Sequence, residues 1–389
     1  MLYRINPKNG DKLSQLGCGC MRFQKDDKEL EKQIVTAIGG GVNYFDTAYL
    51  YPHSEERLGR ALAANGLRGK VKLATKIPPF LVKKNEDFDK IFTKSLKRLQ
   101  TDYIDYYLIH MLTDVAGWER LVSLGVLDWI AGKKADGKII NIGFSYHGGR
   151  AEFIKLCDVY DWDFCMIQYN FLDENNQAGK GGLEYAAAKG IPVIIMEPLR
   201  GGKLVTNLPK EVYGLWESAY VKRSPAEWAF RWVWNHPQVL TVLSGMNTLA
   251  QVEENVRVAS EAEAGAFGAA DYVLFEQARQ ILSEKIKVNC TGCGYCLPCP
   301  KGVDIPACFS CYNDTAVEKK TRAFMNYLMQ TSMKKQTSNA SLCVDCGRCV
   351  PHCPQNIAIP QELRRVKKKF EKFYFRPLRW AVKKFMKIK

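Results

Sequence analysis

The sequence contains no run of about 20 uncharged apolar residues, the length that a helix needs to span a bilayer. We therefore expect no membrane-spanning helix. The first eleven residues are polar and lack the apolar core of a secretory signal, so we expect a cytoplasmic protein. No G-x-G-x-x-G turn follows the first predicted strand, which argues against an open dinucleotide-binding sheet.

Disulfide-type spacing is also missing, because the 14 cysteines are not dispersed as in a secreted chain. Ten of them lie between Cys290 and Cys353, at short and regular intervals. In a cytoplasmic chain this pattern indicates metal binding. The four others are scattered, and we expect them to be packing residues: Cys18, Cys20, Cys157 and Cys165.

Short β-branched apolar segments alternate with amphipathic stretches over the first 260 residues. Eight segments predict strands: Gln15–Gly19, Val42–Asp46, Val71–Lys76, Tyr103–His110, Ile139–Phe144, Asp163–Gln168, Val193–Met196 and Leu240–Ser244. The clearest helical stretches are Asp27–Ile38, Ser54–Ala64, Asp87–Leu99, Gly149–Val159 and Pro225–Asn235. Strand–helix alternation implies a parallel sheet covered by helices, and eight repeats favour a closed (β/α)8 TIM barrel of the α/β class.

We predict four parts in the chain. Residues 1–260 form the barrel, with a short hairpin at 1–12 capping its floor, and residues 261–288 form a helical connection. Cysteine, glycine and proline then dominate a ferredoxin-like domain at 289–362, and a basic, aromatic tail occupies 363–389.

The cysteines form two motifs, each ending in Cys-Pro. The first comprises Cys290, Cys293, Cys296 and Cys299, and the second comprises Cys343, Cys346, Cys349 and Cys353. The second motif has the spacing of bacterial ferredoxins, in which the fourth cysteine binds the other cluster. We therefore predict two [4Fe–4S] clusters, one on Cys290, Cys293, Cys296 and Cys353 and the other on Cys343, Cys346, Cys349 and Cys299.

Two alternatives remain for this segment. The first motif is one residue short before Cys299, so Cys308 or Cys311 is another candidate for that ligand, although both fit core packing as well. Zinc is the alternative metal, but zinc sites typically use separated cysteine pairs and not runs of four.

Four polar residues lie at or just after the ends of three successive predicted strands: Asp46, Tyr51, Lys76 and His110. The unperturbed pKa of tyrosine, about 10, is too high for efficient proton transfer at neutral pH, and a neighbouring ammonium lowers it. Lys76 would supply that charge, Asp46 would hold Lys76, and His110 would orient the substrate oxygen. Each residue alone fits a packing or capping role, but together they predict proton delivery to a carbonyl oxygen.

Longer stretches around these residues resemble the aldo-keto reductase family. They are Asp46–Leu62, Leu73–Lys76, Asp102–His110, Ile142–Ser145, Ile167–Asn170, Ser244–Met246 and Glu253–Asn255. The resemblance covers roughly residues 1–260, and the fused cysteine motifs match the branch with a C-terminal [4Fe–4S] domain. It implies an NAD(P)(H)-linked oxidoreductase acting on a carbonyl or alcohol substrate, with Asp46, Tyr51, Lys76 and His110 as its catalytic tetrad.

The resemblance also implies which residues hold the nicotinamide cofactor. Ser145 and Gln168 would contact the carboxamide, and the adenosine half and the rest of the cofactor would meet Met196, Leu199, Gly201, Ser244, Met246, Gln251, Glu254 and Asn255. The sequence departs from the family pattern, because Met196 replaces an aromatic residue, and Gly245, Met246 and Gln251 stand where cations usually bind the 2′-phosphate. The loop Arg200–Lys203 fits either a pyrophosphate contact or a simple tight turn.

The two predicted cofactors transfer different numbers of electrons. Nicotinamide gives two as a hydride, whereas iron–sulfur clusters usually pass one at a time. Three interpretations follow. The clusters are structural, or a flavin in the barrel converts two-electron transfer into one-electron transfer, or the clusters reduce a substrate that accepts single electrons. The alternative function is therefore a ferredoxin-linked electron-transfer protein whose barrel no longer uses a nicotinamide.

The positive charge is concentrated in the tail. Residues 364–389 carry twelve Lys or Arg and one Glu, a net charge of +11 out of +15 for the whole chain. Interleaved aromatic residues fit an anionic membrane surface, which would make the protein peripheral to the inner face of the membrane. An acidic carrier such as a ferredoxin or flavodoxin is the second candidate partner, and a solvated tail is the third interpretation. We expect no nucleic acid, because no binding module accompanies the charge.

Overall fold

The computed structural model describes the chain except residues 207, 317–319, 334–335 and 386–389. The chain divides into two compact units. The first comprises Met1–Leu199 and Ala226–Gly268, and the second comprises Arg200–Pro225 and Ala269–Lys389. Among the described residues, no helix combines the length and the apolar character that crossing a bilayer requires.

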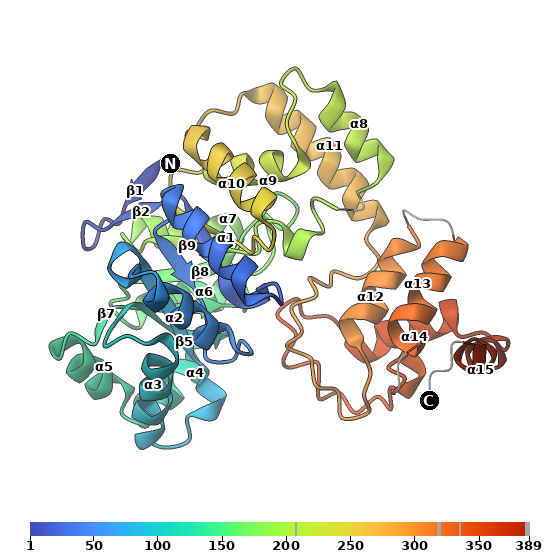
Figure 1. The fold of residues 1–389 in the computed structure, drawn as a ribbon, viewed down its shortest axis with the longest axis horizontal. Coiled ribbons are helices and arrows are strands. Elements are labelled where there is room, and N and C mark those ends of the chain that lie inside the picture. Colours follow the sequence, from blue (N-terminus) through green and yellow to red (C-terminus); the bar gives the residue numbers. More distant parts are fainter. Residues whose placement is uncertain (207, 317–319, 334–335, 386–389) are drawn as a thin grey trace. The chain divides into compact units, whose positions relative to one another are not determined.

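The first unit is a closed barrel of eight parallel strands, each paired with the next along the chain and the last with the first (Figure 1). The strands are β3 (Leu16–Gly19), β4 (Tyr44–Asp46), β5 (Lys72–Ile77), β6 (Ile104–Leu112), β7 (Ile139–Tyr146), β8 (Phe164–Gln168), β9 (Val193–Met196) and β10 (Val239–Ser244). Each predicted strand agrees with the structure to within two residues. The predicted TIM barrel is confirmed.

Helices follow the strands and cover the barrel. They are α1 (Asp27–Gly39), α2 (Ser54–Ala64), α3 (Glu86–Leu99), α4 (Val115–Ser123), α5 (Val126–Ala135), α6 (Arg150–Asp158), α7 (Gly179–Ala188), α9 (Pro225–Trp234) and α10 (Leu249–Glu261). Their ends follow local chemistry: the Asp26 carboxylate accepts hydrogen bonds from the backbone N–H groups of Lys28 and Glu29 at the start of α1. Helix α3 buries Phe88, Ile91, Phe92, Ser95 and Leu99, the stripe that its sequence period predicts.

The barrel interior is filled by side chains from alternate positions of the strands. Tyr106 lies at its centre, with ring centroids 5.2 Å from Tyr44 and 4.9 Å from Phe164 in edge-to-face geometry. Leu108, Met166 and Ile194 belong to the same buried group. The interior is therefore a packed core, and any reactive site must lie at an end of the barrel.

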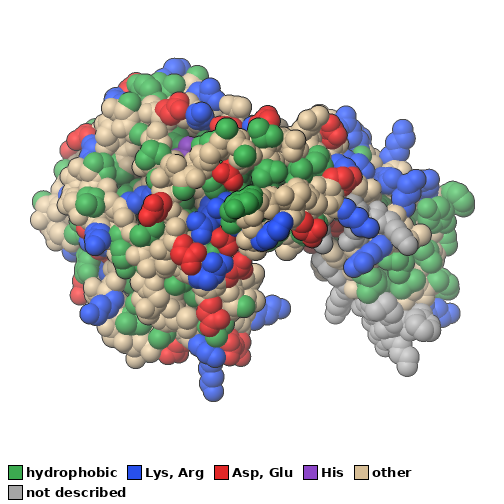
Figure 2. Space-filling view, turned by 90° about the horizontal axis from the view of Figure 1, so that it is seen from above, with side chains coloured by type: hydrophobic (Ala, Val, Ile, Leu, Met, Phe, Trp, Pro, Cys, Tyr) green, Lys and Arg blue, Asp and Glu red, His purple; other side chains and the backbone are tan. Residues whose placement is uncertain are grey.

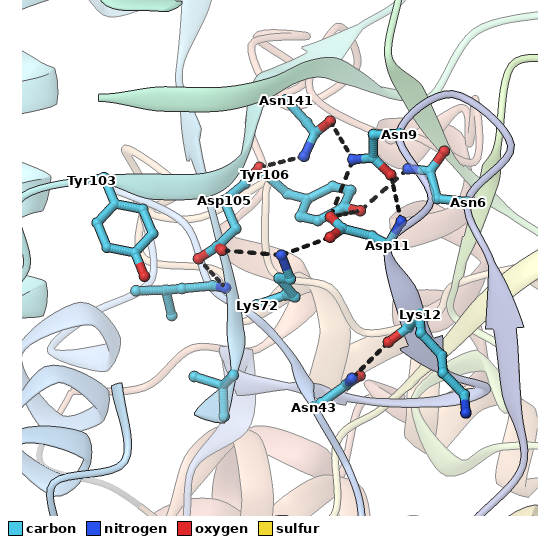
Figure 3. Close-up of polar contacts among 12 residues, drawn as sticks. Asn6, Asn9, Asp11, Lys12, Asn43, Lys72, Tyr103, Asp105, Tyr106 and Asn141 are labelled. Carbon is cyan, nitrogen blue, oxygen red and sulfur yellow. Dashed lines mark hydrogen bonds and ion pairs between the residues drawn. The ribbon is translucent and has the colours of Figure 1, made fainter. Parts of the chain in front are cut away.

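A hairpin closes the amino-terminal end of the barrel, as predicted. Strand β1 (Tyr3–Ile5) pairs antiparallel with β2 (Lys12–Ser14). The Asp11 carboxylate, in the turn between them, accepts a hydrogen bond from Tyr106 (2.8 Å) and lies 2.7 Å from Lys72 Nζ (Figure 3). Because this network occupies the starts of the strands, it stabilises the floor, and the carboxyl ends of the strands form the opposite, functional end.

The second unit contains α8 (Lys210–Ser218), α11 (Ala269–Lys285), α12 (Ile305–Asp314), α13 (Lys320–Ser332), α14 (Ile359–Phe370) and α15 (Phe375–Phe385). Its core is apolar and aromatic: the Tyr327 and Phe370 rings stack at 4.5 Å. Helix α8 belongs to this unit because it packs on α11, with Trp216 and Phe275 rings 5.3 Å apart and Lys285 bonded to Glu211 at 2.5 Å. The segment that follows β9 thus joins the cysteine-rich unit, although it precedes residue 260.

Candidate active site and cysteine sets

Three of the four predicted catalytic residues come from the carboxyl ends of three adjacent strands. Asp46 is the last residue of β4, Lys76 is the last but one of β5, and His110 lies near the end of β6. Tyr51 lies in the loop between β4 and α2, where its backbone N–H donates to the Ala48 carbonyl at 3.0 Å. Since β4, β5 and β6 are neighbours in the barrel, these side chains converge.

The four side chains lie close together at this end of the barrel. Lys76 Nζ donates to Asp46 Oδ1 at 2.5 Å and to the Thr47 carbonyl at 2.7 Å. The same ammonium lies 5.3 Å from the centroid of the Tyr51 ring, and this ring lies 6.0 Å from the His110 ring at 81°. Asp46, Lys76 and His110 are at most 3% exposed, and Tyr51 is half-buried. The site is thus a closed ion pair with a more accessible phenol beside it.

Burial and the Lys76 charge set the protonation states here. Burial raises the pKa of the Asp46 carboxyl, and the attraction and hydrogen bond of Lys76 oppose that rise. Burial lowers the pKa of His110 well below its ordinary value of 6.5, and the Lys76 charge lowers it further. His110 is therefore neutral at pH 7 and acts as a polar hydrogen-bonding group without a positive charge.

A second histidine, which the sequence reasoning missed, belongs to the same end of the barrel. His147 directly follows β7 and is 4% exposed, and its Nδ1 lies 3.2 Å from Gln177 Oε1. Burial lowers the pKa of His147 to about 4, and the Lys76 charge lowers it as well. Its position just after a strand, like that of Tyr51, was the signal that could have identified it.

The predicted carboxamide contacts already have partners within the barrel. Ser145 Oγ accepts a hydrogen bond from the Met111 N–H at 2.9 Å. Gln168 Nε2 donates to Asp173 Oδ2 at 2.8 Å, and Gln168 Oε1 accepts from Gln177 Nε2 at 2.7 Å. The structure thus places Gln168 in a buried amide and carboxylate network that the sequence did not reveal.

The residues predicted for the adenosine half cluster around the end of β10 and the start of α10. Asn255 Nδ2 donates to Ser244 Oγ at 3.0 Å, and Gln251 Oε1 accepts from the Asn247 N–H at 3.0 Å. Met246 is buried, and Glu254 is partly exposed on α10. These four predicted residues therefore lie together with Asn255 at one corner of the barrel end.

The loop after β9 distributes its predicted residues between the two units. Met196, the last residue of β9, and Leu199 are half-buried in the first unit, whereas Gly201 belongs to the second. Arg200 Nη2 donates to the Asn289 carbonyl at 3.4 Å, and Lys203 Nζ donates to Ser310 Oγ at 3.1 Å. Both cations of this loop thus contact the cysteine-rich unit to which they belong.

The cysteines of the two motifs gather in two sets. Burial raises the pKa of the Cys296 thiol, and so do the nearby Cys293, Cys290 and Cys353. Burial likewise raises the pKa of Cys349, together with Cys343, Cys299 and Cys346. These are the two predicted sets of four, including the exchange of Cys299 and Cys353 between the motifs. All 14 cysteines lie in the described part of the chain, and none of them forms a disulfide.

The first set surrounds a hollow in the second unit. Cys290, Cys293, Cys296 and Cys353 line it, with apolar walls from Ile305 and Phe309. All four cysteine donors of this set are thiols, the ligand type that iron–sulfur clusters use.

The remaining pair of cysteines in this unit packs in the core. Cys308 and Cys311 lie on α12 with no exposed surface, among the apolar residues of the second unit. Cys308 Sγ donates to the Ser338 carbonyl at 3.9 Å. This position agrees with the packing interpretation of the two residues.

Comparisons with known proteins identify both units. Residues 15–264 match the aldo/keto reductase family model, and residues 289–358 match the 4Fe-4S dicluster domain model. Protein tas of Escherichia coli is 26% identical over 321 aligned residues, which cover 66% of this chain and 92% of that protein. Methylglyoxal reductase YeaE of Escherichia coli is 28% identical over 264 residues, covering 63% of this chain and 85% of its own length.

Solved structures support the fold. The holo form of aldo-keto reductase AKR11C1 from Bacillus halodurans superimposes with a TM-score of 0.60 at 24% identity, covering 72% of this chain and 96% of that one. Since a family model matches well over half of the chain and a dicluster model follows it, the protein is an oxidoreductase enzyme that belongs to the aldo/keto reductase family and carries a C-terminal 4Fe-4S dicluster domain.

Proposed function

We propose that the protein reduces a small carbonyl substrate, or oxidises the corresponding alcohol, with Tyr51 as general acid or base. The observation that carries this proposal is the Lys76 ammonium, which contacts Asp46 and lies 5.3 Å from the Tyr51 ring. A cation at this distance favours the phenolate and makes the phenol a better proton donor at neutral pH. The carbonyl oxygen takes the Tyr51 proton in the reductive direction, and neutral His110 orients that oxygen.

The substrate class follows from the site and from one relative. The reactive end of the barrel offers a half-buried tyrosine beside two buried neutral histidines, with no free cation suited to a charged substrate group among the tetrad residues. Methylglyoxal reductase YeaE is one of the relatives, so small aldehydes and ketones are the first substrates to assay.

We propose that NAD(P)(H), which supplies a hydride when bound, occupies the barrel end formed by β7–β10. Ser145 and Gln168 would hold its carboxamide, while Met196, Leu199 and Gly201 would flank it. The adenosine half would meet the residues around the start of α10: Ser244, Met246, Gln251, Glu254 and Asn255. The hydrogen bonds of Gln168 to Asp173 and Gln177 have to rearrange or be shared for such a contact.

The internal hydrogen bonds of Gln168 also support a second candidate function, electron transfer linked to a ferredoxin. In this candidate, the barrel either uses no nicotinamide or holds a flavin in its place. Gln168 is engaged internally, and the loop cations Arg200 and Lys203 contact the dicluster domain. An adapter such as a flavin would then be needed between one- and two-electron chemistry.

Anaerobic titration of the purified protein with NADPH and NADH separates the two candidates. Under the first, either nucleotide binds below millimolar concentration and supports turnover of a small aldehyde. Absence of binding by both nucleotides, with cluster reduction by a reduced ferredoxin or flavodoxin, would support the second. A flavin would appear in the absorbance of the supernatant after denaturation.

We propose that the dicluster domain holds two [4Fe–4S] clusters, one on Cys290, Cys293, Cys296 and Cys353 and the other on Cys299, Cys343, Cys346 and Cys349. The two sets of neighbouring thiols support this division. Bound clusters would supply one-electron transfer. About eight iron atoms per chain are expected after anaerobic purification, and zinc in their place would contradict the proposal.

Helix α15 supports peripheral attachment to an anionic membrane surface. Phe375 anchors the helix in the core of the second unit, whereas Phe373 is 92% exposed and Trp380 is 66% exposed. Lys384 lies 5.1 Å from the Trp380 ring, so cations flank the exposed aromatic groups. Figure 2 shows Lys and Arg side chains together with hydrophobic ones over the helices of this unit. Amphipathic helices of this composition bind the interface of anionic bilayers, and on that basis we propose that the protein attaches to the inner face of the membrane.

A further inference from the structure

The loop between β9 and α8 brings two cations to one of the two cysteine sets. Arg200 is 2% exposed, and its guanidinium donates to the carbonyl of Asn289, the residue before Cys290. Lys203 donates to Ser310 on α12, the helix whose Ile305 and Phe309 line the hollow at Cys290. Two positive charges from a distant part of the sequence thus contact residues adjacent to the lining of one cluster site.

The backbone of this loop is held in an unusual conformation. Arg200 has φ +47°, in the left-handed region that non-glycine residues rarely adopt, and the next two residues are glycines at +66° and +91°. Such a conformation costs about 1 kcal/mol or more at a non-glycine residue and persists only where surrounding contacts impose it. The fold therefore turns the Arg200 side chain toward Asn289 at some cost in stability.

The second cysteine set has an acidic neighbour instead. Cys343 Sγ lies 3.8 Å from Asp345 Oδ1, and Asp345 accepts a hydrogen bond from Arg364 at 2.7 Å. Asp345 and Arg364 are both about half exposed, so water screens this pair. Cys346 of this set is exposed, whereas the four cysteines of the first set are all partly buried.

We propose that Arg200 and Lys203 raise the reduction potential of the cluster held by Cys290, Cys293, Cys296 and Cys353 above that of its neighbour, so that electrons enter the dicluster domain at the exposed cluster and collect at the cation-flanked one. This inference rests on the proposed occupancy of both cysteine sets.

The physical reason is the charge that reduction adds. Each cluster gains one negative charge when it takes up an electron, and a buried cation nearby stabilises the reduced form more than the oxidised form. Arg200 contacts the residue before Cys290, and Lys203 contacts the helix that lines the same hollow, so both charges act on this cluster in the same sense. An aspartate near the other set has the opposite effect, weakened by Arg364 and by solvent.

The electron balance is simple. One electron from an external one-electron donor reduces the exposed cluster, and transfer to the cation-flanked cluster reoxidises the first. No proton or bond is involved. The donor's chemical class is a reduced one-electron carrier, such as an iron–sulfur or flavin protein, or dithionite in the laboratory.

The test is a potentiometric titration of the full-length protein, reduced with dithionite and followed by electron paramagnetic resonance. Two midpoints are expected in the wild type. In Lys203→Gln and Arg200→Gln, only the higher midpoint falls. At the potential where this cluster is half reduced in the wild type, its reduced-to-oxidised ratio in the variants is about tenfold lower. This corresponds to a fall of about 59 mV in the midpoint potential for one electron.

Matched variants keep the test decisive. Lys203→Arg retains the charge and should keep the wild-type midpoint, which distinguishes an electrostatic effect from a packing defect. Asp345→Asn, which tolerates the left-handed backbone at φ +57°, should raise the lower midpoint and leave the higher one unchanged. Lys203 is only half-buried, so its variant should fold even if Arg200→Gln does not.

The outcomes are distinguishable. The inference is overturned if both iron–sulfur midpoint potentials are unchanged in Lys203→Gln, or if both shift by the same amount. In either case the proposed cluster content stands. A protein without iron–sulfur absorbance or with about four irons per chain overturns the cluster assignment itself.

Discussion

The Lys76 ammonium lies 2.5 Å from the Asp46 carboxylate, and neither side chain is more than 5% exposed. Loss of one partner of such a buried pair leaves an uncompensated charge, at a cost of about 3–5 kcal/mol. We therefore expect Lys76→Met to abolish turnover and also to lower the thermal midpoint of the barrel by roughly 6 °C or more. The double variant Lys76→Met/Asp46→Leu should recover most of the midpoint without recovering activity. Equal thermal midpoints of the single and double variants would contradict the expectation that the unpaired Asp46 charge causes the loss of stability.

Tyr51→Phe removes only the phenol hydroxyl. Because the ring is half-buried and its packing is retained, the thermal midpoint should change little. Turnover of aldehydes should fall by about 100-fold or more, the contribution of a positioned general acid. The iron content and the rate of cluster reduction by dithionite should equal those of the wild type. Unchanged aldehyde turnover would remove Tyr51 from the mechanism.

Stability should fall at mildly acidic pH because of His147. Its pKa is about 4 in the folded protein against 6.5 unfolded, so between these values the unfolded chain binds a proton that the folded chain does not. The stability that depends on neutral His147 is therefore complete above pH 6.5 and is lost as the pH falls toward 4, with about 2 kcal/mol lost between pH 7 and pH 5. Buried His110 adds a loss in the same direction.

Denaturant melts at pH 7 and pH 5 test this expectation. In His147→Gln, which keeps a hydrogen-bonding group beside Gln177, the loss of stability between the two pH values should be smaller than in the wild type. A loss of equal size in both proteins would exclude His147 as its cause.

A single substitution of a ligand cysteine should remove about half of the iron bound per chain. Cys353→Ser and Cys293→Ser should affect the same cluster, although they lie in different motifs, and each should retain about four iron atoms per chain. Cys308→Ala should retain about eight, because that side chain packs in the core and contacts the Ser338 carbonyl. Iron analysis with absorbance near 400 nm measures both, and loss of iron in Cys308→Ala would make it a ligand.

The exposed face of α15 should govern binding to vesicles. Co-sedimentation with phosphatidylserine vesicles should fall several-fold in Trp380→Ser and in Lys383→Gln/Lys384→Gln, with no change in melting, because these side chains lie outside the buried core. Vesicles of neutral phosphatidylcholine are the control, since they lack the anionic surface that attracts the cations. Tight binding of an acidic ferredoxin, without vesicle binding, would favour a protein partner for this helix.

Local patterns predicted most of the fold. All eight barrel strands, the hairpin at its floor and the division of the cysteines between two motifs follow from short-range periodicity and spacing. The convergence of Asp46, Lys76 and His110 could also be predicted, because strand ends in a parallel barrel share one edge.

Long-range partners were beyond the sequence pattern. The engagement of Gln168 by Asp173 and Gln177 depends on how one loop folds back over β8, and no periodicity encodes it. The attachment of α8 to the dicluster unit depends on Trp216 meeting Phe275, almost 60 residues away in the chain. The strand–helix alternation therefore placed Arg200 with the barrel, whereas its contacts lie near Asn289.

The discontinuous second unit, built from Arg200–Pro225 and Ala269–Lys389, determines how the two units can be separated. A single cut of the chain near Gly268 would leave α8 on the barrel fragment, with Trp216 separated from Phe275. The dicluster fragment would then lack Arg200 and Lys203. During synthesis, α8 emerges from the ribosome before α11 has been made. The barrel can therefore close with β10 before α8 can pack on α11. An exchange of the dicluster domain between enzymes must therefore include the Arg200–Pro225 insertion as well.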